Sequence, residues 1–444
     1  MNQKDFFELL STNYQFVSPE IKKNKLEEFR DNDVVELVNR ILNQANQIGA
    51  SDIHIEPRIN DKVYIRLRVE GQMIDLGFLD YKYRENVISR IKVLANMDIS
   101  EKRKPQDGKL SVLVGDPNVR LNLRVATFPT AGGLEDMVMR LLPNEEPLPL
   151  NNIGLHLANL KKMERILNDP YGMIFVCGPT GSGKTTSLHS MLKYLNIPER
   201  KIWTAEDPVE ITQDGMRQVQ IQKFLDYATV LRAFLRGDPD VIMIGEIRDA
   251  ESATIASEAS LTGHLVLSTL HTNSAVESVI RVISMGVNHF TVADAVLGVL
   301  AQRLCRTLCS KCKESYVASK EEIVELIKAF SQEMRQTDIF RENPDEFAKS
   351  LYQNWVEQYG ENGKINLYKP RGCSRCRNGY RGRIGIHELM INSDEIKNAI
   401  IARKSSDEIE KIALEQGMFS LKMDGIIKII TGVIDLAQLE IISK

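Results

Sequence analysis

Residues 173–186, MIFVCGPTGSGKTT, have the residue types and spacing of a loop that binds phosphate. Glycines allow backbone N–H groups to curl around the phosphates of a nucleotide, and a helix that follows them adds partial positive charge at its N-terminus. Lys184 can reach the β- and γ-phosphates, and the Thr185 hydroxyl can ligate Mg²⁺. An apolar strand before the loop and a helix after it disfavour a chance glycine-rich turn. We expect a nucleoside triphosphate site formed by Gly178, Pro179, Thr180, Gly181, Ser182, Gly183, Lys184, Thr185 and Thr186.

Two acidic segments indicate what the triphosphate is used for. The segment DVIMIGEIRD is an apolar strand ending in Glu246, which is placed to meet Mg²⁺ or its water shell. The segment TAEDPVE ends another apolar strand with Glu206, Asp207 and Glu210. One of these carboxylates could orient or deprotonate an attacking water, because phosphoryl transfer needs positioning and charge stabilisation more than covalent chemistry. The alternative is a solvated acidic loop.

Histidines and arginines extend the candidate site. His264 and His271 lie seven residues apart at the two ends of an apolar strand, where they could sense a γ-phosphate or contact a neighbouring subunit. The alternative is a structural role for both. Arg124 and Arg140 precede the nucleotide-binding segment and are candidates for cationic charge supplied across a moving boundary. They could equally be exposed arginines on a sheet face.

Four cysteines form two CxxC pairs, which indicates a metal site. Sixty residues, 313–372, separate the pair Cys309 and Cys312 from the pair Cys373 and Cys376. In a reducing compartment two such pairs predict a tetrahedral Cys₄ zinc site with a structural role, since four thiolates leave no open position for chemistry. Four free cysteines are the alternative. Cys305 is close enough in sequence to imitate a ligand, and we expect Cys177 to be a small core residue.

The elements that must position these residues divide the chain of 444 residues into several domains. Apolar residues three and four apart predict a helix over 34–49, and alternation predicts strands over 63–69 and 119–125, with a helix at about 83–97 between them. Farther along, apolar strands interleave with helices, which implies a mostly parallel sheet covered on both faces. The predicted order is a helical extension (1–33), a small α/β domain (34–142), a linker (143–153), a nucleotide-binding core (154–304), a tetracysteine module (305–390) and a C-terminal helical region (391–444).

Composition and charge restrict the class of protein. The net charge of −3 gives no sign of a polyanionic partner, and few aromatic residues lie on the arginine-bearing strands of the small domain. No apolar run is long enough to span a bilayer, and the N-terminus lacks the layout of a signal peptide. We therefore expect a cytoplasmic protein.

The motif set resembles the type II/IV secretion ATPase superfamily. The segments GPTGSGKTT, TAEDPVE, DPDVIMIGEIRD and TGHLVLSTLHT are similar, in order, to its Walker A motif, Asp box, Walker B motif and His box. GASDIHIEP, RIKVLANMDISEKRKPQDGKL and RVATFPT in the small domain, together with the cysteine pairs, resemble the pilus assembly and export branch. The resemblance covers about residues 34–444. It implies a PAS-like small domain, a RecA-like core and a hexameric ring that hydrolyses ATP with Mg²⁺.

The resemblance also implies roles for single residues. Lys184 and Thr185 match the Walker A ligands, and Glu246 matches the Walker B glutamate. Glu210, the last acid of the Asp box, is the expected catalytic base, whereas Glu206 and Asp207 are expected to face the nucleotide. The remaining matches are the His-box pair, His264 and His271, and the small-domain arginines, Arg124 and Arg140.

The function expected from this resemblance is to power type IV pilus assembly or extension of a type II secretion pseudopilus. The implied partners are five further copies of the chain and a platform protein of the inner membrane, at whose cytoplasmic face the ring would work without binding nucleic acid. A pilus-retraction motor would catalyse the same reaction with the opposite mechanical outcome. A nucleic-acid-translocating RecA-like motor and a catalytically dead scaffold are more distant alternatives.

Overall fold

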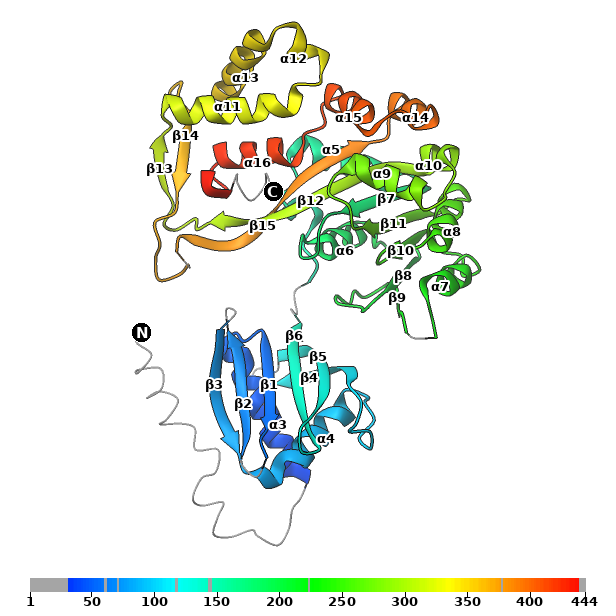
Figure 1. Ribbon diagram of the computed structural model, residues 1–444, viewed down its shortest axis with the longest axis vertical. Coiled ribbons are helices and arrows are strands. Elements are labelled where there is room, and N and C mark those ends of the chain that lie inside the picture. Colours follow the sequence, from blue (N-terminus) through cyan, green and yellow to red (C-terminus); the bar gives the residue numbers. More distant parts are fainter. Residues whose placement is uncertain are drawn as a thin grey trace. The chain divides into compact units, whose positions relative to one another are not determined.

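The chain folds into two compact units, Met1–Glu145 and Glu146–Lys444, each of which is described by itself. The computed structural model (Figure 1) describes residues 31–59, 62–69, 72–115, 119–142, 146–222, 224–376 and 378–438, with side chains from Val34 onward. Most of the extension expected over residues 1–33 therefore lies outside the described residues.

The first unit is a six-stranded antiparallel sheet with strand order β3-β2-β1-β6-β5-β4. Side chains at alternating positions, such as Ile53, Ile65 and Leu123, are buried together with the apolar faces of two helices. This arrangement explains the alternation seen in the sequence. The elements are α3 (Asp31–Ile48), β1 (Asp52–Pro57), β2 (Val63–Val69), β3 (Gln72–Leu79), η1 (Tyr81–Tyr83), α4 (Arg84–Leu94), β4 (Gln106–Val114), β5 (Val119–Thr130) and β6 (Leu134–Leu142).

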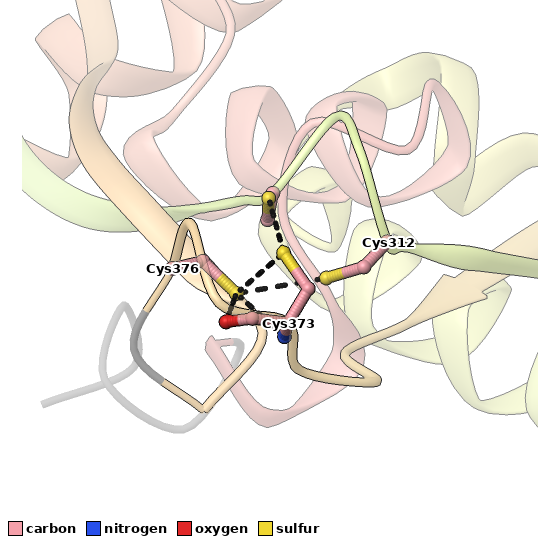
Figure 2. Close-up of side chains that lie close together, drawn as sticks. Cys312, Cys373 and Cys376 are labelled. Atoms are coloured by element: carbon pink, nitrogen blue, oxygen red, sulfur yellow. Dashed lines mark hydrogen bonds between the residues drawn. The ribbon is translucent and has the colours of Figure 1, made fainter. Parts of the chain in front are cut away.

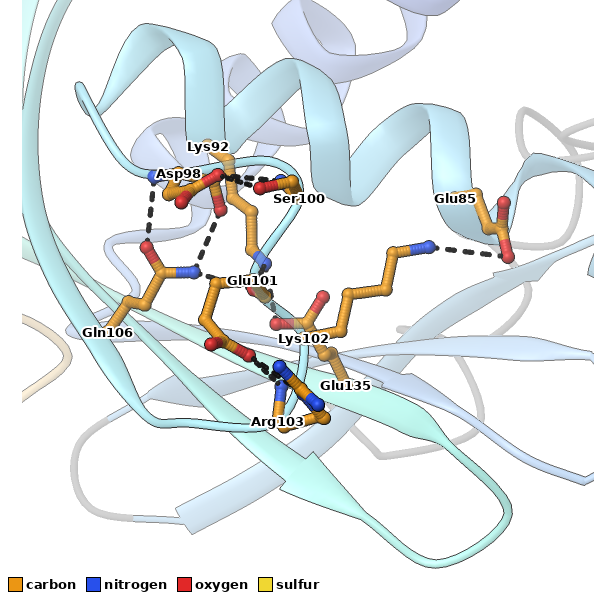
Figure 3. A network of polar contacts seen from close by, with 9 residues as sticks. All are labelled: Glu85, Lys92, Asp98, Ser100, Glu101, Lys102, Arg103, Gln106 and Glu135. Atoms are coloured by element: carbon orange, nitrogen blue, oxygen red, sulfur yellow. Dashed lines mark hydrogen bonds and ion pairs between the residues drawn. The ribbon is translucent and has the colours of Figure 1, made fainter.

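A buried lysine fixes the connection between α4 and β4 (Figure 3). Lys92 is 1% exposed, and its Nζ lies 2.6 Å from Glu135 Oε1 and 2.9 Å from the Glu101 carbonyl oxygen. Gln106 Nε2 donates to the carbonyl oxygens of Asp98 and Glu101. Because a buried charge is tolerated only when it is paired and hydrogen-bonded, Lys92 ties this loop to β6.

The second unit contains a seven-stranded sheet with strand order β15-β12-β7-β11-β10-β8-β9. Only the β12–β15 pairing is antiparallel, and the other neighbours run parallel. Every residue of β7, β10 and β11 is buried, as expected for central strands of a parallel sheet. The strands are β7 (Gly172–Cys177), β8 (Ile202–Glu206), β9 (Arg217–Gln220), β10 (Val241–Ile244), β11 (Leu265–Leu270), β12 (Val296–Leu308) and β15 (Tyr380–Ile391).

Helices cover both faces of this sheet, so the predicted α/β architecture is confirmed. Ile174 and Val176 of β7 pack with helices α5 and α6, whereas Phe175 and Cys177 pack with helices α7 to α10 on the opposite face. The bounds are η2 (Leu150–Asn152), α5 (Leu157–Leu167), α6 (Lys184–Leu195), α7 (Tyr227–Phe234), α8 (Ala250–Leu261), α9 (Ala275–Ser284) and α10 (His289–Ala295).

The remaining elements of the second unit lie at the β12–β15 end of the sheet (Figure 1). Phe330 of α11 contacts Trp355 of α13 and Phe419 edge to face, so the segment between the cysteine pairs joins the main core. The finer partition into core, cysteine module and tail stays a prediction. The elements are β13 (Glu314–Val317), α11 (Lys320–Met334), α12 (Asp338–Glu342), α13 (Pro344–Tyr359), β14 (Asn366–Lys369), α14 (Asp394–Ile401), α15 (Ser406–Glu415), α16 (Leu421–Ile430) and η3 (Leu436–Gln438).

Among the described residues, no helix has the length and apolar character needed to cross a bilayer.

Candidate active site

The phosphate loop connects β7 to α6, and glycines give it its shape. Gly178, Gly181 and Gly183 have φ values of 148°, 80° and 88°, a region that favours glycine. Gly178 is also sterically required, because a Cβ there would lie 2.4 Å from the carbonyl oxygen of Gln302. The loop therefore leads directly into α6, which begins at Lys184.

Lys184 lies folded over this loop. Its Nζ donates hydrogen bonds to the carbonyl oxygens of Gly178 (2.7 Å) and Pro179 (3.1 Å). Burial lowers the pKa of Lys184, and the nearby carboxylate of Glu246 acts in the opposite direction. The half-buried ammonium thus lies where it could reach a phosphate after giving up two carbonyl contacts. Thr185 follows it in the first turn of α6 and is partly exposed.

Glu206, at the end of β8, is buried and accepts hydrogen bonds from three side chains. It accepts hydrogen bonds from Thr204 Oγ1 (2.7 Å), Gln218 Nε2 (2.8 Å) and His189 Nε2 (3.2 Å). Gln213 Nε2 donates to both the His189 carbonyl and Nδ1, which places the ring proton on Nε2. Burial acts to raise the pKa of Glu206, but the hydrogen bonds, first that from His189, hold it below its ordinary value. Glu206 therefore braces β8 against α6 and β9.

The other two acids of this segment lie in the loop after β8. Asp207 and Glu210 are both exposed, in contrast to Glu206. A water activator needs a carboxylate that solvent can reach. Of the predicted acids in this segment, the exposed pair meets that requirement.

Glu246 follows β10 and meets His271, which follows β11. Glu246 Oε2 lies 3.4 Å from His271 Nε2, and Oε1 pairs with the guanidinium of Arg248. Burial raises the pKa of Tyr227, with the negative charges of Glu246 and Asp207 adding to the effect. The carboxyl ends of β8 and β10 thus bring predicted acids together beside Tyr227. Sequence reasoning missed Arg248 and Tyr227, because no motif of phosphate chemistry singles them out.

The two predicted histidines lie at opposite ends of β11. In the parallel pairing of β11 with β7, Leu265 is opposite Gly172, whereas Leu270 is opposite Cys177, the residue before the phosphate loop. Since a strand rises about 3.3 Å per residue, roughly 20 Å separates the two histidines. The ring of His264 donates to the Ala259 carbonyl at 3.0 Å. Of the two predicted histidines, His271 lies at the end of β11 beside the phosphate loop, and His264 lies at the other end.

Arg124 and Arg140 lie in the first unit, directly opposite each other on β5 and β6. Like charges in such a pair repel, and each arginine has its own carboxylate partner. Arg140 Nε lies 2.8 Å from Asp52 Oδ1, and an Arg124 amino group lies 3.4 Å from Asp107 Oδ1. Burial acts to raise the pKa of Asp52, but the hydrogen bond from Arg140 helps to hold it below the ordinary value.

The four predicted cysteine ligands form one cluster at the tip of the β12–β15 pair (Figure 2). Their sulfur atoms all lie within 4.8 Å of one another. The separations are 4.0 Å for Cys309–Cys373, 3.6 Å for Cys312–Cys376 and 3.6 Å for Cys373–Cys376. Four sulfurs about 2.3 Å from a shared tetrahedral Zn²⁺ would be about 3.8 Å apart. The cluster is therefore a metal-type site whose dimensions suit zinc.

The other two cysteines are buried and lie outside this cluster. Burial raises the pKa of the Cys305 thiol to about 11 and that of Cys177 to about 12. Both thiols are thus protonated core groups near neutral pH, and their position outside the cluster excludes them as its ligands.

A phosphate loop at the carboxyl end of a central parallel strand, with acids at the ends of β8 and β10 in the same sheet, defines a RecA-like P-loop nucleotide-binding protein. Solved structures share this fold. The Legionella pneumophila ATPase DotB superimposes with a TM-score of 0.61 at 20% identity, covering 95% of this chain and 98% of that one. The pilus retraction motor PilT with bound ADP gives 0.62 at 23% identity, covering 91% and 96%.

Sequence comparison gives the family. The sequence model described as Type II/IV secretion system protein matches residues 27–441. Type II secretion system ATPase E of Vibrio cholerae is 40% identical over 99% of this chain and 80% of its own length. The type IV pilus assembly ATPase PilB of Thermus thermophilus is 41% identical over 90% of this chain but only 42% of its own length. The chain belongs to the type II/IV secretion system protein family, which confirms the resemblance seen in its motifs.

Proposed function

We propose that this chain is the motor that powers assembly of a type IV pilus or a type II secretion pseudopilus. It is an ATPase, and its relatives are named as type II secretion or pilus assembly ATPases. One observation carries the chemical part of the proposal. Lys184 lies on a glycine-shaped loop, and Glu246 and His271 lie at the same end of the sheet.

The residues present divide the work of hydrolysis among them. The loop N–H groups and Lys184 would bind the β- and γ-phosphates, and the Thr185 hydroxyl would help to hold Mg²⁺, which neutralises phosphate charge when bound. Glu210 would take a proton from the attacking water while ATP is cleaved to ADP and phosphate. The exposure of Glu210, against the burial of Glu206, supports this choice. Glu246 would orient the water shell of the metal together with His271.

The working assembly in this proposal is a hexamer that docks on a platform protein at the cytoplasmic face of the inner membrane. Arg124 and Arg140 would approach the phosphates when a small domain closes, and His264 would contact a neighbouring subunit. The four clustered cysteines would hold one Zn²⁺ that fastens the tip of the β12–β15 pair. The exposed arginines and the sulfur separations support these roles.

A retraction motor is the nearest alternative. The likeness to PilT, at 23% identity, extends to the fold alone. The relatives near 40% identity carry assembly or secretion names, which favours extension over retraction.

The test is ATP hydrolysis by the purified chain with and without double-stranded DNA. We expect Mg²⁺-dependent release of phosphate that DNA does not stimulate and that Lys184→Ala abolishes. Stimulation of several-fold by DNA would instead favour a nucleic-acid translocase. Equal rates for the parent and the Lys184 variant would overturn the assignment of the loop.

A further inference from the structure

Gln302, on β12, lies against the phosphate loop from inside the protein. The residue is only 1% exposed, and it directly follows the run VLGVLA, which has no polar side chain, in this strand. The amide Nε2 donates to the Ser182 carbonyl at 2.7 Å, and Oε1 accepts from Ser187 Oγ at 2.7 Å. One planar group thus joins β12 to the loop and to the first turn of α6.

The glycines of the loop fit around this residue. A Cβ at Gly178 would lie 2.4 Å from the carbonyl oxygen of Gln302, and a Cβ at Gly183 would lie 3.1 Å from its Nε2. Real Cβ atoms essentially never approach backbone oxygen as closely as the first of these distances. The loop therefore wraps closely over Gln302, which makes the position of β12 part of the shape of the phosphate site.

The bond to Ser182 has a consequence for the next peptide group. In a trans peptide the C=O and N–H point in opposite directions. Because the Ser182 carbonyl is held toward the buried amide, the N–H of Gly183 points away from β12 and toward the open side of the loop. An outward N–H at a helix N-terminus is the donor that a phosphate oxygen requires.

We propose that Gln302 is a positioning residue for nucleotide binding, which orients the Ser182–Gly183 peptide from beneath. This inference rests on the proposed nucleotide site. The role requires an amide, which presents a donor and an acceptor side by side. Glutamate would turn an oxygen toward the Ser182 carbonyl. Methionine would fill the same volume and make neither hydrogen bond.

The same strand pair offers a matched control at its other end. Asn392 is a buried amide that donates to the carbonyl oxygens of Ala293 (2.8 Å) and Val296 (2.6 Å). It follows Ile391, which lies opposite Gly298, whereas Gln302 lies opposite His387. About five residues of strand, or roughly 16 Å, therefore separate Asn392 from the level of the loop.

The experiment measures two properties of Gln302→Met, Ser187→Ala and Asn392→Leu in the full chain. These are the affinity for a fluorescent ADP with Mg²⁺ and the unfolding temperature without nucleotide. We expect about tenfold weaker ADP binding for Gln302→Met and about threefold for Ser187→Ala, in line with the loss of two and one hydrogen bonds. Asn392→Leu should lower the unfolding temperature as Gln302→Met does, yet bind ADP like the parent. That split separates positioning from general stability.

Lys184→Ala distinguishes failure of this inference from failure of the proposed function. If it binds ADP like the parent, the nucleotide site itself is misassigned. If it loses binding while the Gln302 and Ser187 variants keep parental affinity, only the positioning role is wrong. Equal loss of affinity in the Asn392 variant would also overturn that role. Should Gln302→Met fail to fold, parental affinity in Ser187→Ala would count against the role, and a threefold loss would support it.

Discussion

The phosphate loop in the second unit and the arginines on the sheet of the first unit are held in opposite ways. At the loop, Lys184 bonds two carbonyl groups, and the neighbouring acid Glu206 is buried with three donors around it. On the sheet of the first unit, the side chains of Arg124 and Arg140 are 50% and 68% exposed and pair with Asp107 and Asp52. A surface ion pair of this kind is worth about 0–1 kcal/mol.

In the proposed mechanism, this difference suits the separate roles given to the two sets of residues. Glu206 is held by hydrogen bonds from three side chains, whereas Lys184 must give up two carbonyl contacts to reach a phosphate. An arginine that completes a site from elsewhere must exchange its resting partner for the phosphate, and a weak surface ion pair permits that exchange at little cost. Substitutions in the two regions should therefore differ in how strongly they slow ATP hydrolysis.

The largest effect is expected from Glu210→Gln in the second unit. The variant should bind ATP like the parent and hydrolyse it at least about a hundredfold more slowly, because only proton removal from water is lost. Single-turnover hydrolysis measured beside nucleotide binding checks this. Because Glu210 is exposed, the variant should fold like the parent, and an unchanged unfolding temperature would verify this. Near-normal hydrolysis would shift the role of base to Asp207 or Glu246.

Arg124→Ala and Arg140→Ala test the role proposed for the exposed arginines of the first unit. Each should lower kcat by about tenfold or more while leaving ATP affinity nearly unchanged, because the charge matters most as the phosphoryl group transfers. Arg66→Ala is the matched control, since Arg66 also pairs with a carboxylate on this sheet, Glu56, at 2.6 Å. Steady-state kinetics decide the matter. Parental turnover in both variants would leave them as surface arginines.

Cys373→Ser tests whether the nucleotide site depends on the metal cluster. Zinc content should fall from about one per chain to a trace, and proteolysis within residues 313–372 should accelerate, because metal binding stabilises the fold around its ligands. ADP binding should be largely retained. Cys305→Ala should keep the zinc, as its thiol lies outside the cluster. Elemental analysis of protein never exposed to chelator checks both variants, and zinc below a tenth per chain in the parent would remove the site.

The smallest expected effect comes from Glu388, a buried acid that accepts a hydrogen bond from the Ala275 N–H at 2.7 Å. Burial raises its pKa from 4.5 to about 7. The folded chain therefore binds this proton more tightly than the unfolded chain, so its contribution to stability is present below pH 4.5 and declines as pH rises toward 7. Glu388→Gln should be more stable than the parent at pH 8 by a few degrees and lose that advantage near pH 5. Thermal unfolding at both values tests the sign.

Local patterns predicted much of this molecule. The strand, loop and helix at residues 173–186, the alternation in β2 and the grouping of four cysteines follow from spacings within short segments or from ligand chemistry. The burial of Glu206 was not visible, because it depends on Thr204, Gln218 and His189 arriving from three elements. Which of His264 and His271 lies beside the phosphate loop depends on the direction and register of β11 against β7. The signal at Gln302 was a polar residue directly after the apolar start of β12, which hints at burial without identifying a partner.

Strand β12 also restricts how the length of this chain can change over evolution. It carries Gln302 beneath the phosphate loop and ends one residue before Cys309. Since successive side chains in a strand point to opposite faces, inserting or deleting one residue between these two positions would reverse the side chains beyond it. The pairing with β15 shifts register between Arg306 and Leu308. Two residue steps along β12 face three along β15 there, so an added residue in β12 is best accommodated at that point, after the amide and before the metal ligand.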